Sequence, residues 1–97
     1  MTDCKRLEII IDALHVDAAA QLLRDAGVSG YTVLAATSGW GDRGERVPDG
    51  VSRVFENRVV LCACQPEQLD AITAGLGPLL ARYGGVALVS DASLMSH

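Results

Sequence analysis

The residues best suited to bind a ligand are concentrated in one polar stretch, residues 39–57. Four arginines in or just after it can make charge-assisted, bidentate bonds to phosphate or carboxylate oxygens: Arg43, Arg46, Arg53 and Arg58. Four glycines in the stretch let backbone N–H groups approach an anion closely: Gly39, Gly41, Gly44 and Gly50. This composition predicts a loop that binds an anionic ligand. A solvated loop without a ligand has the same polar composition and is the alternative.

Carboxylates balance the arginines of this stretch. They are Asp42, Glu45, Asp49 and Glu56. We therefore expect ion pairs within the loop that a ligand's phosphates would replace, rather than a permanently basic pocket. The alternative for Arg53 and Arg58 is a surface pair with Glu56 or Asp49, of the kind that contributes little to stability.

The sequence offers little for catalysis, and we predict that the protein is not an enzyme. It shows no Ser/His/Asp or Cys/His arrangement and no Walker-type lysine, and the glycines of GWGDRG precede a predicted strand rather than a helix. Cys62 and Cys64 are two residues apart on a predicted strand and so share a face, as a metal or redox pair would. No histidine lies near them, and buried cysteine ordinarily acts as a small hydrophobe, which is the interpretation we favour. His15 is expected to be a capping or surface residue. No cofactor or metal is expected.

The overall composition limits the partners and the location. The chain has 97 residues, which predicts a single domain spanning 1–97, and its net charge of −4 argues against nucleic acid as a partner. Neither a membrane-spanning segment nor a signal peptide is visible, so we expect a soluble, cytoplasmic protein. A domain of this size buries a modest share of its surface, which favours self-association.

Hydrophobic periodicity predicts the order of elements that positions the polar stretch. Strands are predicted at 5–12, 31–38, 54–64 and 86–90, and helices at 16–27 and 66–83, with a kink or break near Gly77 because Pro78 follows it. The order β-α-β-β-α-β is that of an α+β, ferredoxin-like sandwich, one four-stranded antiparallel sheet with two helices on one face. The long polar loop then joins the second and third strands. We expect neighbouring subunits to cover the other sheet face.

This arrangement resembles the PII signalling family and its PII-like relatives. The segment GYTVLAATSGWGDRG is similar to the end of the second strand and the base of the T-loop, with Gly39-Trp40-Gly41 as its Gly-aromatic-Gly step. The strand with Phe55 and Arg58 resembles the one that re-enters from the T-loop with a basic residue. The turn Tyr83-Gly84-Gly85 stands where these proteins have a B-loop that wraps the phosphates.

The resemblance implies a homotrimer with adenine nucleotides bound in three clefts between subunits. The nucleotide-binding residues that we predict come from the second strand, the loop base, the third strand and the glycine turn. They are Thr32, Ser38, Gly39, Trp40, Gly41, Arg43, Arg46, Arg58, Gly84 and Gly85. An adenine ring would lie on the strand surface around Thr32, Val33, Leu61 and Cys62. The alternatives are that Gly84 and Gly85 only stop a helix and that Trp40 only anchors the loop base by packing.

Departures from the family pattern narrow the function that the resemblance implies. The B-loop is very short, and the loop tip lacks the tyrosine that many PII proteins carry as a modification site, so uridylylation is not expected. The compact, Arg-containing loop looks most like the PII-like branch associated with carboxysomes and inorganic-carbon transport. That branch implies binding of ADP, AMP or ATP and of bicarbonate. It also implies that ordering of the T-loop controls docking to a partner, such as a bicarbonate transporter or a carboxysome-related protein.

Other functions stay open on the sequence alone. A trimeric metal-binding protein of the CutA type is also ferredoxin-like and would use Cys62 and Cys64 as soft ligands. A small ferredoxin-like enzyme or a generic ligand-binding module of the same fold are further alternatives.

Overall fold

The computed structural model describes residues 1–37, 39–41, 44–46 and 57–96. Strand β1 (Thr2–Asp12) leads through a 3-10 turn, η1 (Ala13–His15), into helix α1 (Val16–Asp25). The remaining elements follow in the order β2 (Thr32–Thr37), β3 (Gly39–Gly41), β4 (Gly44–Arg46), β5 (Asn57–Cys64), α2 (Pro66–Tyr83) and β6 (Val86–Leu94). Residues 54–56, which the sequence assigned to the third main strand, lie outside the described residues.

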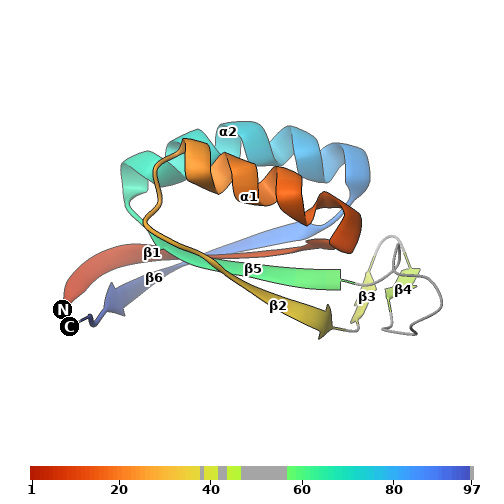
Figure 1. The fold of residues 1–97 in the computed structure, drawn as a ribbon, viewed down its shortest axis with the longest axis horizontal. Coiled ribbons are helices and arrows are strands. Elements are labelled where there is room, and N and C mark those ends of the chain that lie inside the picture. Colours follow the sequence, from red (N-terminus) through yellow and green to blue (C-terminus); the bar gives the residue numbers. More distant parts are fainter. Residues whose placement is uncertain (38, 42–43, 47–56, 97) are drawn as a thin grey trace.

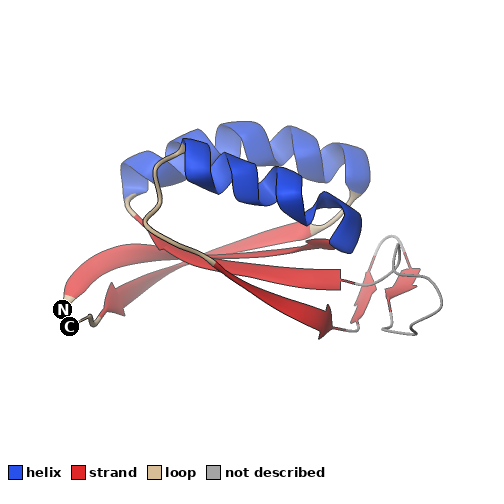
Figure 2. Cartoon of the chain, viewed as in Figure 1, coloured by secondary structure: helices blue, strands red, loops and turns tan. Residues whose placement is uncertain are grey.

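The main sheet has four antiparallel strands in the order β2-β5-β1-β6, and both helices cover one of its faces (Figures 1 and 2). This confirms the predicted ferredoxin-like sandwich. The two termini lie together at one end of the sheet, where Thr2 pairs with Leu94. Strands β3 and β4 lie beyond the opposite end, so the two ends of the sheet have different neighbours (Figure 1).

The last strand is longer than its sequence predicted. The expected strand 86–90 continues to Leu94, because β6 pairs with β1 along its whole length, from Ile10 opposite Val86 to Thr2 opposite Leu94. Polar residues such as Ser90 and Ser93 are acceptable there because β6 is an edge strand with exposed side chains. The C-terminal end of β6 is therefore set by its hydrogen bonds to β1 and not by its hydrophobic pattern.

The helix is not broken near Gly77, where the sequence predicted a kink or break, since α2 runs from Pro66 to Tyr83 with Pro78 inside it. Proline removes the hydrogen bond to the carbonyl of Ala74, four residues before it. Both Ala74 and Pro78 are exposed, so water can solvate that carbonyl. Leu76 on one side of the proline is buried and Leu80 on the other packs against the core, so the helix is packed on both sides of Pro78.

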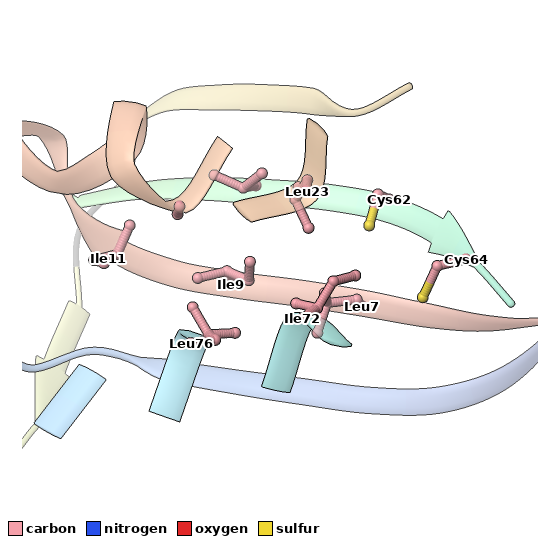
Figure 3. Close-up of a cluster of buried hydrophobic side chains, with 10 residues drawn as sticks. Leu7, Ile9, Ile11, Leu23, Cys62, Cys64, Ile72 and Leu76 are labelled. Atoms are coloured by element: carbon pink, nitrogen blue, oxygen red, sulfur yellow. The ribbon is translucent and has the colours of Figure 1, made fainter. Parts of the chain in front are cut away.

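The core lies between the helices and the sheet (Figure 3). From β1, the alternate residues Leu7, Ile9 and Ile11 point toward the helices and are at most 1% exposed. They meet apolar side chains from both helices and from β5, including Leu23, Cys62, Ile72 and Leu76. The intervening β1 residues therefore point to the other side of the sheet.

That other side, here called the open face, carries large apolar side chains in contact with solvent. Leu34, Val86, Leu88 and Leu94 are 49%, 52%, 57% and 46% exposed. No helix covers this face in the described part of the chain (Figure 1). Apolar side chains exposed together on one face of a sheet form a candidate interaction surface.

Within the described residues, neither helix is long and apolar enough to cross a bilayer.

Candidate functional site

Four strands meet at the sheet end that faces β3 and β4, and we call this the loop end. Its register places Asn57 opposite both Asp12 of β1 and Thr37 of β2, while Ile10 stands opposite Val86, the first residue of β6. The polar stretch therefore begins and ends at the loop end, and the turn before β6 lies there as well. No local motif in the sequence predicts that these segments meet. The prediction follows only from the ferredoxin-like order of the elements.

The turn between α2 and β6 requires glycine at two successive positions. Gly84 has φ 84° and its N–H donates to the Leu80 carbonyl oxygen at 2.8 Å, so it caps the helix. Gly85 has φ 113°, and a Cβ there would lie 2.7 Å from the Ile10 carbonyl oxygen. Gly84 therefore ends the helix, whereas glycine is required at position 85 by its close contact with β1. This contact anchors the turn at the loop end.

Arg58 lies on the opposite side of β1 from this turn, at the start of β5. It pairs across the ladder with Ile11, and its half-buried side chain donates from Nη1 to the Asn57 carbonyl oxygen at 3.1 Å. Gly85 contacts Ile10 and Ile11 from the β6 side. The structure therefore brings Arg58, Gly84 and Gly85 together at the loop end. A cation and a glycine turn at the same end of the sheet suit an anionic ligand.

The predicted loop base contains a short hairpin that the sequence did not indicate. Strand β3 pairs with β4 so that Gly39 faces Arg46, Trp40 faces Glu45 and Gly41 faces Gly44. Two glycine-flanked segments of this length lack the apolar alternation that identifies a strand. Ser38 and Arg43 lie outside the described residues, and ligand contact by any loop residue stays a prediction.

Thr32 is far from this edge, and the proposed adenine surface is wrong. Thr32 begins β2, five residues before Thr37, which corresponds to about 16 Å along a strand. It pairs with Leu61 on the open face, whereas Cys62 is 6% exposed and lies in the core on the helix side. Val33 pairs with Val60 and so also points to the helix side. One flat ring cannot contact both sides of a sheet.

The structure reveals one pair at the loop end that the sequence did not predict. The rings of His15 and Tyr83 stack with centroids 3.8 Å apart and an interplanar angle of 20°. His15 stands at the N-cap position of α1, as predicted, but its side chain makes no cap hydrogen bond and is only partly exposed. Its Nδ1 is buried and has no hydrogen-bond partner in the described part of the chain. Only the meeting of the η1 and α2 ends creates this contact, and neither local pattern signals it.

Replacing His15 by phenylalanine should stabilise the fold. The substitution His15→Phe keeps an aromatic ring for the stack on Tyr83 and removes a buried nitrogen whose lack of a partner costs about 1–3 kcal/mol. The free energy of unfolding, measured by urea denaturation, should rise by about 1 kcal/mol. His15→Ala is the control and should lower it, because the stack is lost. A lower value for His15→Phe would mean that the nitrogen has a partner in solution.

The three cysteines are buried and count among the apolar core residues. Cys4, Cys62 and Cys64 are free thiols and buried. Burial, with a smaller contribution from Cys64, raises the pKa of Cys62 to about 11, and burial raises the pKa of Cys64 as well. Metals bind the thiolate, which this environment disfavours. Among the described residues no group of three or more Cys, His, Asp or Glu could hold a metal ion, so the CutA-type alternative gains no support.

Comparison with known proteins agrees with the architecture. The family model for nitrogen regulatory protein P-II matches residues 4–96. CPII from Thiomonas intermedia K12, a nitrogen regulatory PII-like protein solved with ADP, AMP and bicarbonate, is 30% identical with a TM-score of 0.84. The match covers 93% of this chain and 86% of that chain. No curated protein sequence matches significantly.

More distant structures share the fold. A PII-like signalling protein from Thermus thermophilus is 21% identical with a TM-score of 0.75, over 94% of this chain and 88% of that chain. The B. subtilis GlnK–ATP complex is 16% identical with a TM-score of 0.65, over 95% and 84%. The nearly complete family match and the close structural similarity to CPII lead to one assignment: this chain belongs to the nitrogen regulatory protein P-II family, as a PII-like signalling protein.

Proposed function

We propose that this protein is a homotrimeric regulator that binds adenine nucleotides and bicarbonate at the loop end, in clefts between subunits. The observation that carries the proposal is the meeting of Arg58 and the Gly84–Gly85 turn at one edge of the sheet, next to both attachments of the polar loop. Support comes from CPII, whose structure contains ADP, AMP and bicarbonate and which is 30% identical over 93% of this chain.

The chemistry of the edge explains how an oxyanion would be held. The Arg58 guanidinium supplies a permanent positive charge that forms strong bonds to phosphate or bicarbonate oxygens. The glycine turn has no side chains, so a ligand can approach its backbone closely. Ligand contacts by Ser38, Gly39, Trp40, Gly41, Arg43 and Arg46 form part of this proposal, because those residues belong to the loop base. Thr32 would contribute only if another subunit brings the ligand to the open face.

Regulation would follow from the state of the polar loop. A nucleotide or bicarbonate bound at its base exchanges the loop's internal ion pairs for contacts with the ligand, and so orders the loop. The ordered loop then docks to a partner protein of inorganic-carbon metabolism, such as a bicarbonate transporter or a carboxysome-related protein, in the cytoplasm. The protein acts in this proposal as a regulator and performs no catalysis.

A calorimetric series tests the proposal directly. AMP, ADP and ATP are titrated into the protein, each with and without bicarbonate, and the molar mass is measured by light scattering. We expect a trimer and at least one nucleotide that binds with a micromolar Kd, about −8 kcal/mol. If none of the three nucleotides gives a heat of binding, with or without bicarbonate, the proposal is wrong.

Removing the Arg58 charge should weaken nucleotide binding. A hydrogen bond to a charged group contributes about 1.5–3 kcal/mol, so Arg58→Ala should raise the Kd for ADP roughly 10- to 150-fold. Arg24→Ala is the matched control, because Arg24 is an exposed arginine in the last turn of α1 that bonds Tyr31 and Gln21. It should leave the Kd unchanged. If both variants bind ADP with the same Kd, Arg58 does not contact the nucleotide.

A further inference from the structure

Two charged side chains stand in the middle of the open face. They are Arg6 and Glu8, whose positions in β1 alternate with those of the buried Leu7 and Ile9. The ladder places Glu8 between Leu61 of β5 and Leu88 of β6. The pair therefore lies at the centre of the surface that the proposed trimer would cover.

Arg6 and Glu8 contact each other, with Nη2 and Oε1 2.5 Å apart. Their side chains are 52% and 25% exposed, so in a single chain water screens the pair and its effect on stability is small. When another copy covers the face, water no longer screens the Arg6–Glu8 pair. A carboxylate removed from water needs a charged partner, and an apolar pair at the same place would often associate more tightly. Charges retained in such a place are explained better by selection of the right partner than by stability.

We propose that Arg6 of each copy binds both its own Glu8 and the Glu8 of the neighbouring copy, so that three pairs close into a ring. This inference rests on the proposed trimer. A guanidinium has five N–H donors, and the half-exposed Arg6 has room for a second carboxylate beside its contact with Glu8. The face is self-complementary, since each copy offers one acid and one base, and rotational symmetry sets the acid of one copy against the base of the next. The occupant of the open face is therefore a second copy of this chain.

Exchange of the two charges tests the ring. The double variant Arg6→Glu with Glu8→Arg is mixed with the wild-type protein, and the composition of the trimers is read by native mass spectrometry. We expect each protein to form trimers alone, because a swapped ring has the same pairing. Mixed trimers should be rare, against about three quarters for random mixing, because like charges meet at every mixed contact. Random mixing would overturn the inference while leaving the trimer intact.

The two single variants provide a second test that does not depend on the double variant. Arg6→Glu and Glu8→Arg each leave two like charges per copy, so each alone should associate roughly 100-fold more weakly than the wild type, or weaker still. Both should remain folded by circular dichroism, because both side chains reach solvent on the open face of a single chain. Mixing the two should restore association in part if the pairs form between copies, because two of the three contacts in a mixed trimer then join opposite charges. Failure of the mixture to associate would show that the pair acts only within one chain. A monomeric wild-type protein would instead overturn the proposed trimer, and the ring with it.

Discussion

Leu88→Asp should convert the protein into a folded monomer that no longer binds nucleotide. Leu88 is 57% exposed on the open face and stands opposite Glu8, so the change creates two neighbouring carboxylates. Covering the added carboxylate with another copy would cost several kcal/mol, because Arg6 in the proposed ring is already bound to two glutamates. Since the proposed clefts lie between subunits, loss of the trimer also removes the binding site. Light scattering should give the mass of one chain, and calorimetry should show no heat with ADP.

The neighbouring residue offers a matched control for this variant. Val89 follows Leu88 in the same edge strand and is 47% exposed, but it stands opposite the buried Leu7 and so belongs to the helix side. Val89→Asp should therefore leave the trimer and its Kd for ADP nearly unchanged. A trimeric Leu88→Asp variant would show that copies meet through another surface, and the binding site would have to be sought there.

The fold could be predicted because its core residues are regularly spaced. Alternation of Leu7, Ile9 and Ile11 predicted β1, and all three are buried beneath the helices. The helical spacing that ends at Leu23 likewise predicted the buried side of α1. Spacing of this kind reflects burial directly, and burial of apolar side chains is the dominant favourable contribution to folding.

The incorrect boundaries have a common physical cause, which is that tertiary contacts outweigh local preferences. Ser90 and Ser93 have little strand preference, yet pairing with β1 extends β6 past both. Pro78 disfavours a helix interior, yet packing of Leu76 and Leu80 on the core keeps α2 continuous. Neither long-range contact can be read from the residues around the boundary.

The candidate site was predictable in its residue types but less so in its geometry. Arginine and glycine indicated an anion site, and the register then brought Arg58 and Gly85 to one edge while it separated Thr32 from them. Cys62 was misplaced because a strand that is apolar on both sides does not reveal which side faces the helices. The stack of His15 on Tyr83 could not be found, since it depends on how two element ends meet.

Gly85→Ala should be among the most destabilising single changes in this chain. Its φ of 113° strains any L side chain, at about 1–3 kcal/mol, and the new Cβ would lie 2.7 Å from the Ile10 carbonyl oxygen. That oxygen belongs to a central strand with partners on both sides and cannot shift without disturbing the ladder. Leu80, 3.1 Å away, can move more easily. We expect the free energy of unfolding to fall by about 3 kcal/mol or more, which lowers Tm by about 12–24 °C in a domain of this size.

Gly77→Ala is the matched control, because it is the same substitution in a helix interior with no atom within 4 Å of the new Cβ. It should raise the free energy of unfolding by about 0.5–1 kcal/mol, since alanine favours the helix. Both Tm values are measured at one protein concentration, because association shifts Tm. An unchanged Tm for Gly85→Ala would show that the turn can move away from β1. In that case the turn and Arg58 would not be held at a constant separation, and a ligand that bridges them would have to order the edge itself.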